Sequence, residues 1–129
     1  MVTIEDIESR TAALGPEGRA LLNRLSERAI PLLERMPTVP DTKALLSKDG
    51  GTCPACGGSL AFDPWRPVEH RCADCGAVAR GERHDGNWAR GQHLWIAERA
   101  AHLAAVGVFA DDRAYADRGR EFLRAYYER

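Results

Sequence analysis

The chain has 129 residues, 44% of them hydrophobic and 29% charged, which is enough for one ordinary domain with a modest core. Its net charge of −1 argues against a nucleic-acid partner, because such domains normally carry a clustered basic surface. No run approaches the roughly 18 apolar residues of a membrane span, and the acidic N-terminus is unlike a signal peptide. We therefore expect a cytoplasmic protein that binds neither nucleic acid nor membrane. Sixteen arginines against two lysines favour a GC-rich bacterial source.

The N-terminal segment is expected to form two helices. Thr3 can cap the first, with Asp6 three residues later in the capping-box position. Pro16 suits the first turn of the second helix, which carries leucines at helical spacing. Pro31 removes a backbone donor and is expected to kink or end that helix.

Three segments are predicted along the chain. Residues 1–51 are helical and end in a connector from Pro37 onward, with at most one helical turn around Ala44. Residues 52–82 contain two Cys-X-X-Cys pairs, which predict a small metal-bound β ribbon, and residues 83–129 form a helical hairpin. The expected fold class is therefore mostly α with a small β zinc ribbon.

The ribbon is predicted as a β-hairpin. Alternating polar and apolar residues over Ser59–Asp63 and Val68–Cys72 are typical of strands, and Pro64–Pro67 would form the turn. After the ribbon, Asn87 is expected to cap a long helix from Trp88 to about Val108.

A second long helix is expected after it. Asp111 would cap a helix over Asp112–Tyr127, antiparallel to its predecessor. Gly119 on its apolar face would let a neighbouring helix come close.

Four cysteines carry the clearest chemical signal of the chain. Cys53 and Cys56 form one Cys-X-X-Cys-Gly knuckle, and Cys72 and Cys75 form another, with fifteen residues between the knuckles. Two such pairs can direct four thiolates at one ion, and the glycine after each pair permits the necessary turn. The pattern predicts one structural zinc ion per chain, with no open coordination position for catalysis.

The four cysteines also allow two other interpretations, a bound iron ion or two disulfides. A single iron ion also suits four thiolates, as in rubredoxins, whose knuckles lie farther apart. Two disulfides would require an oxidising compartment, which nothing at the N-terminus suggests. His70 and His84 flank the ribbon, but four cysteines already complete a tetrahedron. Both histidines are thus expected to be surface or capping residues, and replacing His70 should have little effect.

Aromatic and polar residues share one face of the first long helix. Trp88, Gln92, Trp95 and Arg99 fall within a narrow arc at about 100° per residue. Flat rings beside forked donors are suited to a sugar-binding cleft. Aromatic residues at helical spacing are also typical of a packed core, with Arg99 paired to a carboxylate on a neighbouring helix. Ile96, Ala100, Leu103 and Val106 overlap the same face and indicate a core contact.

Four runs of the sequence together resemble a known family. The runs are CPACGGSLAFDPW (53–65), HRCADCG (70–76), GERH (81–84) and WARGQHLWIAER (88–99). They resemble the N-terminal part of bacterial heparinase II/III-like polysaccharide lyases, over about residues 50–128.

This resemblance implies a fold and an activity for the parent protein. It implies an incomplete α/α toroid of helical hairpins followed by a β-sandwich, and cleavage of uronic-acid glycosides by β-elimination. The acidic polysaccharide would then be a partner of the full enzyme, with Trp88, Gln92, Trp95 and Arg99 facing its cleft. The catalytic tyrosine or histidine of such lyases lies farther along, and no stretch here matches it. The chain is thus expected to be the inactive front piece of a larger enzyme, with no catalytic residue of its own.

As a lyase fragment the chain is expected to self-associate, because the helices that would cover its apolar face are missing. The alternative is a stand-alone zinc-ribbon adaptor that binds a protein partner through its helical face. Nucleic-acid binding through arginines near the knuckles is disfavoured, because acidic residues alternate with them. A free-standing enzyme is the weakest class, since no nucleophile with a paired base is evident.

Overall fold

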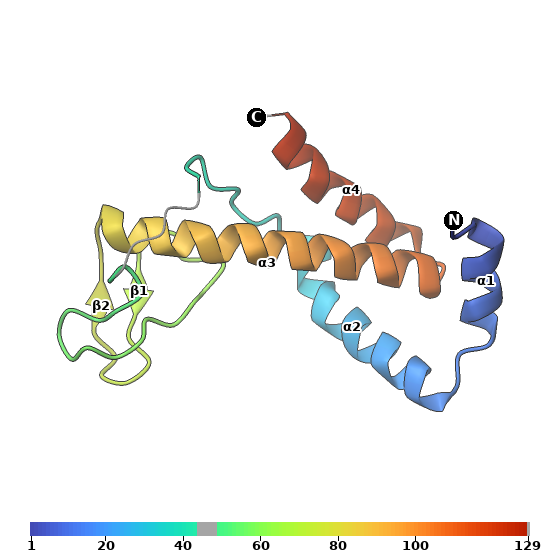
Figure 1. Ribbon diagram of the computed structural model, residues 1–129, viewed down its shortest axis with the longest axis horizontal. Helices are drawn as coiled ribbons and strands as arrows, with labels where there is room; N and C mark the ends of the chain where they lie inside the picture. Colours follow the sequence, from blue (N-terminus) through green and yellow to red (C-terminus); the bar gives the residue numbers. More distant parts are fainter. Residues whose placement is uncertain (44–48, 129) are drawn as a thin grey trace. The chain divides into compact units, whose positions relative to one another are not determined.

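The computed structural model describes residues 1–43 and 49–128. Within these ranges the chain is mostly helical, with four helices and a two-stranded sheet (Figure 1). This agrees with the predicted fold class, while the toroid remains a prediction. The helical turn expected around Ala44 lies outside the described residues.

The chain divides into two compact units, which differ in their bounds from the three predicted segments. Unit 1 comprises residues 1–36 together with 97–129, and unit 2 comprises residues 37–96. The first unit is therefore discontinuous in sequence, and the second is inserted into it.

In unit 1, helix α1 (Ile4–Ala12) has the predicted capping box. The Thr3 hydroxyl accepts a hydrogen bond from the Asp6 N–H at 3.1 Å, and the Asp6 carboxylate accepts the Thr3 N–H at 2.8 Å. These reciprocal bonds satisfy two donors that would otherwise lack a partner at the helix start.

Helix α2 (Pro16–Glu34) begins at the predicted proline and continues through Pro31 for three more residues. Pro31 removes one helical donor, but the Arg35 N–H still bonds to the Pro31 carbonyl at 3.2 Å where the helix ends. The break therefore comes one turn later than the proline itself. Ala29 and Leu32 are the residues of this helix that reach the core.

Helix α3 (Glu82–Phe109) contributes to both units and begins before the predicted cap. Asn87 lies inside the helix, so its expected capping role is wrong. The chain turns at Gly81, whose φ of 117° suits glycine, and the Gly81 carbonyl accepts the N–H groups of His84 and Asp85 at 3.0 Å. The early start extends the helix by almost two turns.

Helix α4 (Arg113–Tyr127) is capped by Asp112, one residue after the predicted cap. The Asp112 carboxylate accepts the Ala114 N–H at 3.1 Å. Asp111 instead adopts a left-handed conformation with φ of 49° and forms the turn that follows α3.

The core of unit 1 lies where α4 meets α2 and the end of α3 (Figure 1). Phe122, Leu103 and Val106 are fully buried. A Cβ atom at Gly119 would lie 3.4 Å from the Leu103 Cβ atom, so the glycine permits the predicted close approach. Arg118 of α4 also donates to the Leu33 carbonyl of α2.

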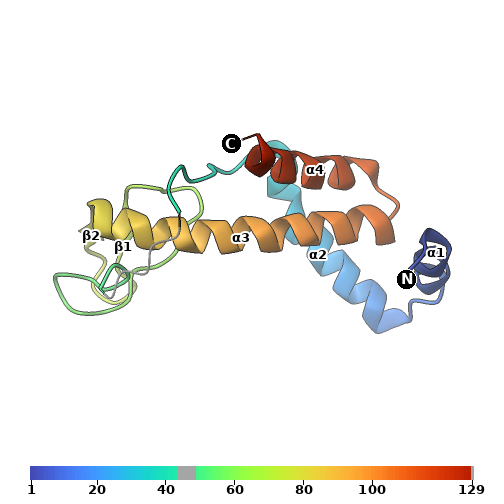
Figure 2. The same ribbon diagram turned by 45° about the horizontal axis from the view of Figure 1, so that its top comes forward.

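The sheet of unit 2 pairs different residues from those predicted. Strands β1 (His70–Arg71) and β2 (Val78–Ala79) are antiparallel and enclose the second knuckle. The predicted partner runs meet only through an isolated bridge between Leu60 and Cys72. Figures 1 and 2 show the two strands beside the first turns of α3.

Candidate metal centre

All four cysteines converge on one point of unit 2. Their Sγ atoms all lie within 4.8 Å of one another. The Sγ atoms of Cys53 and Cys75 are 3.7 Å apart, and those of Cys56 and Cys72 are 3.5 Å apart. None of the four forms a disulfide, and one cysteine of each knuckle is buried while the other is exposed.

Each knuckle is a tight turn stabilised by the same pair of backbone hydrogen bonds. In the first, the Cys53 N–H donates to the Gly58 carbonyl at 2.7 Å, and the Gly57 N–H donates to the Cys53 carbonyl at 2.8 Å. In the second, Cys72 and Gly76 repeat this arrangement at 2.8 and 3.1 Å. Gly57 and Gly76 both have φ of 75°, a conformation that glycine adopts without strain.

Backbone N–H groups point at two of the sulfur atoms. Gly58 N–H lies 3.4 Å from the Cys56 Sγ atom, and Asp74 N–H lies 3.4 Å from the Cys72 Sγ atom. N–H groups of Cys75 and Asp74 lower the pKa of the Cys72 thiol to about 7. For Cys56, the Gly58 N–H lowers the pKa, but the other three thiols and burial outweigh it and raise the pKa to about 12.

The sulfur positions fit a tetrahedral ion. Zinc–sulfur bonds of about 2.3 Å place the sulfur atoms of a regular tetrahedron about 3.8 Å apart. The Cys56–Cys72 and Cys53–Cys75 pairs, at 3.5 and 3.7 Å, approach that spacing. Four sulfur ligands suit zinc and iron alike, so the donor set is compatible with both ions.

The two histidines near the ribbon are buried, and their predicted surface role is wrong. His70 is 3% exposed and His84 is 5% exposed. The His70 Nε2 atom lies 2.7 Å from the Asp85 carboxylate, and the His84 Nδ1 atom lies 2.7 Å from the Gly50 carbonyl. Neither belongs to the sulfur cluster: His70 joins the ribbon to the first turn of α3, and His84 joins that turn to Gly50, just before the ribbon.

Aromatic residues fasten the ribbon loop to α3. The Trp88 indole donates to the Asp63 carbonyl at 2.7 Å, and its ring centroid lies 6.5 Å from that of Phe62. Trp65 meets Trp95 edge to face, with 5.8 Å between centroids and 78° between planes. The sequence pattern did not indicate this role for Phe62 and Trp65, although both are apolar residues of the run 53–65.

The buried side chain of Gln92 also binds this loop through a hydrogen bond. It is fully buried, and its Nε2 atom donates to the Thr38 carbonyl at 3.0 Å and to the Pro64 carbonyl at 3.2 Å. Within residues 1–43 and 49–128, its Oε1 atom has no hydrogen-bond partner. Gln92 thus joins the segment before the ribbon to the loop within it.

The four residues considered for sugar binding have different surroundings. Trp88 and Gln92 are buried in unit 2, as the packing interpretation expects, whereas Trp95 is half-buried. Arg99, in unit 1, donates to the Glu98 carboxylate at 3.0 Å and lies 3.1 Å from the His102 Nδ1 atom. The cavity beside Trp88 measures about 30 Å³, which suits one water molecule and is much smaller than a sugar site.

No family model, curated protein or solved structure matches this chain. None of the helices that the structure describes combines the length and apolar character needed to cross a membrane.

Proposed function

We propose that this chain is the zinc-stabilised N-terminal portion of a heparinase II/III-like polysaccharide lyase. Its own residues supply a folded support, and the proposal assigns no catalytic residue to it. The complete enzyme would cleave a uronic-acid polysaccharide by β-elimination. In that reaction a base removes the proton at C5 while polar groups neutralise the neighbouring carboxylate.

Zinc is the ion that the proposal places among Cys53, Cys56, Cys72 and Cys75. The two knuckles have the Cys-X-X-Cys spacing typical of zinc ribbons, and the sulfur spacing supports a tetrahedral ion. Four thiolates complete the coordination of zinc, so the ion would stabilise the ribbon and leave no position for substrate.

One observation carries the lyase proposal: the separate runs that resemble the family interlock in space. Phe62, Asp63 and Trp65 come from the first run, and they contact Trp88 and Trp95 of the last run. The second and third runs meet where the rings of His70 and His84 lie 6.5 Å apart between centroids. A set of motifs that forms one packed unit supports a shared structural origin for the set.

The packing gives different roles to the four residues considered for sugar binding, Trp88, Gln92, Trp95 and Arg99. Trp88 and Gln92 serve the ribbon, because both donate to backbone carbonyls of the segments that they cover. Trp95 of unit 2 and Arg99 of unit 1 are each half-buried, and for each separately we propose the contact with sugar in the complete enzyme that the family resemblance implies.

The proposal is tested by sequencing the gene downstream of residue 129 and expressing the longer protein. We expect further helical hairpins, a β-sandwich, and formation of unsaturated uronic-acid products, followed by their ultraviolet absorbance. In that protein, Trp95→Ala and Arg99→Ala should lower kcat/KM, whereas Leu94→Ala, at a position 64% exposed on the same helix, should not. A stop codon directly after residue 129, or a longer protein without elimination activity, would refute the proposal.

A second function is favoured by the apolar surface of unit 1. A hollow of about 220 Å³ in this unit is lined almost wholly by apolar side chains, among them Leu21, Leu25 and Phe109, so a partner protein could place an apolar side chain here. In this alternative the chain is a zinc-ribbon adaptor. A stop codon after residue 129 is the result that would favour it over the lyase.

A further inference from the structure

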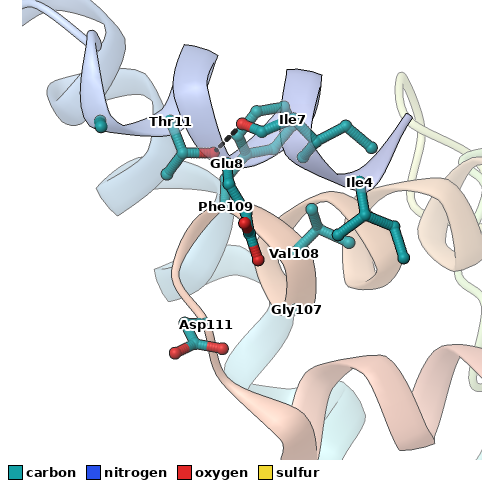
Figure 3. A pocket seen from close by; sticks show the side chains of 9 residues that line it. Ile4, Ile7, Glu8, Thr11, Gly107, Val108, Phe109 and Asp111 are labelled. Atoms are coloured by element: carbon teal, nitrogen blue, oxygen red, sulfur yellow. Dashed lines mark hydrogen bonds between the residues drawn. The ribbon is translucent and has the colours of Figure 1, made fainter. Parts of the chain in front are cut away.

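Unit 1 contains a groove between α1 and the end of α3. Its volume is about 530 Å³, within the range typical of binding sites. Figure 3 shows apolar side chains on both of its sides, with Ile4 and Ile7 on α1 and Val108 on α3. Ile4 and Val108 are 75% and 47% exposed, so much apolar surface faces solvent here.

Two carboxylates lie in this groove without a counter-charge. Glu8 points from α1 toward the end of α3, and Asp111 lies in the turn beyond it (Figure 3). Neither carboxylate has a hydrogen bond or an ion pair with any residue that the structure describes. The Thr11 hydroxyl, which also lines the groove, is occupied by the Ile7 carbonyl at 2.8 Å. A ligand for this groove should therefore combine apolar surface with positive charge.

The exposed face of α4 has the complementary chemistry. Arg120, Leu123, Arg124 and Tyr127 follow the spacing i, i+3, i+4 and i+7, which places them on one side of the helix. Leu123 is 63% exposed and Tyr127 is 90% exposed, while Phe122 is buried in the core. Arg124 has no ion pair with a described residue, and Arg120 has only an exposed contact with Asp117 at 3.1 Å.

From this complementarity we propose that the groove binds the exposed face of α4 from a second copy of the chain. Leu123 and Tyr127 would cover the isoleucines and Val108, while Arg124 would meet Glu8 and Arg120 would meet Asp111. Arginine is suited to this role because its planar group can bind a carboxylate through two hydrogen bonds. Each copy carries both surfaces, so a twofold dimer would form the contact twice.

The inference goes beyond the proposed function and does not depend on it, since all its residues belong to unit 1. It is tested by sedimentation velocity of the full chain with one equivalent of zinc, over a wide range of concentrations. The wild-type chain should form a dimer. Glu8→Arg or Arg124→Glu should weaken the dimer at least about tenfold, as expected for losing a close charge pair across an interface.

The decisive variant combines both reversals. Glu8→Arg with Arg124→Glu recreates the charge pair in the opposite sense and should restore much of the lost affinity. Glu5→Arg and Arg28→Glu are matched controls, because they change the net charge equally at exposed positions that do not line the groove. Circular dichroism and zinc content check that each variant is folded. Leu123→Lys replaces Glu8→Arg if the latter does not fold.

Restoration by the double reversal, with inert controls, supports the dimer. A chain that stays monomeric at millimolar concentration overturns the inference. A dimer whose affinity is unchanged by both single reversals also overturns it. So does an affinity that the single reversals lower and the double variant does not restore, because the contact would then lie elsewhere.

Discussion

The Nε2 atom of His70 lies 2.7 Å from the Oδ1 atom of Asp85, so a buried side chain joins β1 to the first turn of α3. His70 is two residues before the candidate ligand Cys72, yet it stands outside the sulfur cluster. The metal ribbon is therefore attached to the helix by a polar contact as well as by aromatic packing.

Replacing His70 with alanine should destabilise unit 2 without removing the metal. The substitution leaves a cavity and removes the partner of Asp85, so we expect a loss of about 1 to 3 kcal/mol in the free energy of unfolding. Urea denaturation followed by tryptophan fluorescence measures the loss. Arg71→Ala, at the exposed neighbouring position of β1, is the control and should change the stability much less. Equal stability of His70→Ala and the wild type would show that the buried contact contributes nothing.

Replacing Cys72 with serine should instead remove the ion. Three thiolates and a hydroxyl bind zinc more weakly than four thiolates, and the folding of a small ribbon depends on its metal. Native mass spectrometry should show one zinc ion in the wild type and in His70→Ala, but a substantial fraction of Cys72→Ser without metal. A chelator should likewise loosen residues 52–81 of the wild type, as measured by hydrogen exchange. Full zinc occupancy in Cys72→Ser would mean that the ligand set is different.

Two glycines of α3 should respond oppositely to alanine. At Gly107 a Cβ atom would lie 2.7 Å from both the Cβ and the backbone N atoms of Ala116, so α4 would have to shift. Gly107→Ala should therefore cost about 1 to 3 kcal/mol. At Gly86 a Cβ atom would meet nothing within 4 Å, and the substitution should stabilise the helix by up to about 1 kcal/mol. Thermal unfolding of the two variants compares them, and a similar change in both would contradict the close approach at Gly107.

The cap of α1 should depend on pH. The Thr3 N–H, followed by the Thr3 hydroxyl, lowers the pKa of Asp6 from its ordinary value of 3.8. Because the folded pKa lies below the unfolded one, the cap contributes stability above the ordinary pKa and loses it as pH falls through the lowered value. An NMR titration of the Asp6 carboxylate and the Thr3 amide should show this loss. Thr3→Ala removes the hydroxyl but keeps the backbone N–H, so it should raise the Asp6 pKa only part of the way to its ordinary value. An Asp6 pKa at the ordinary value in the wild-type chain would contradict the capping box.

Local signals in the sequence were sufficient for several elements. The Thr3 and Asp6 pair predicts the start of α1, Pro16 predicts the start of α2, and the spacing of the cysteines predicts their convergence. In each case the deciding interactions join residues close in sequence, or follow from a coordination geometry that a single ion imposes.

Other features depend on contacts between distant segments, and the sequence did not reveal them. The start of α3 is decided by Gly81, although Asn87 has the better capping side chain. His70 and His84 can be buried because Asp85 and Gly50 supply hydrogen-bond partners, and no local sequence pattern predicts either contact. The packing role of Gln92 likewise arises from carbonyls of residues 54 and 28 positions away.

The insertion of unit 2 into unit 1 has a consequence for folding. Helices α2 and α4 pack together although unit 2 and the whole of α3 lie between them in sequence. Bringing such distant segments together costs chain entropy, and that cost grows with the length of flexible chain between them. Once residues 37–96 have folded around their own contacts, the flexible length is much shorter. Folding of residues 37–96 before the helices of unit 1 would therefore lower the entropic cost of packing α2 against α4.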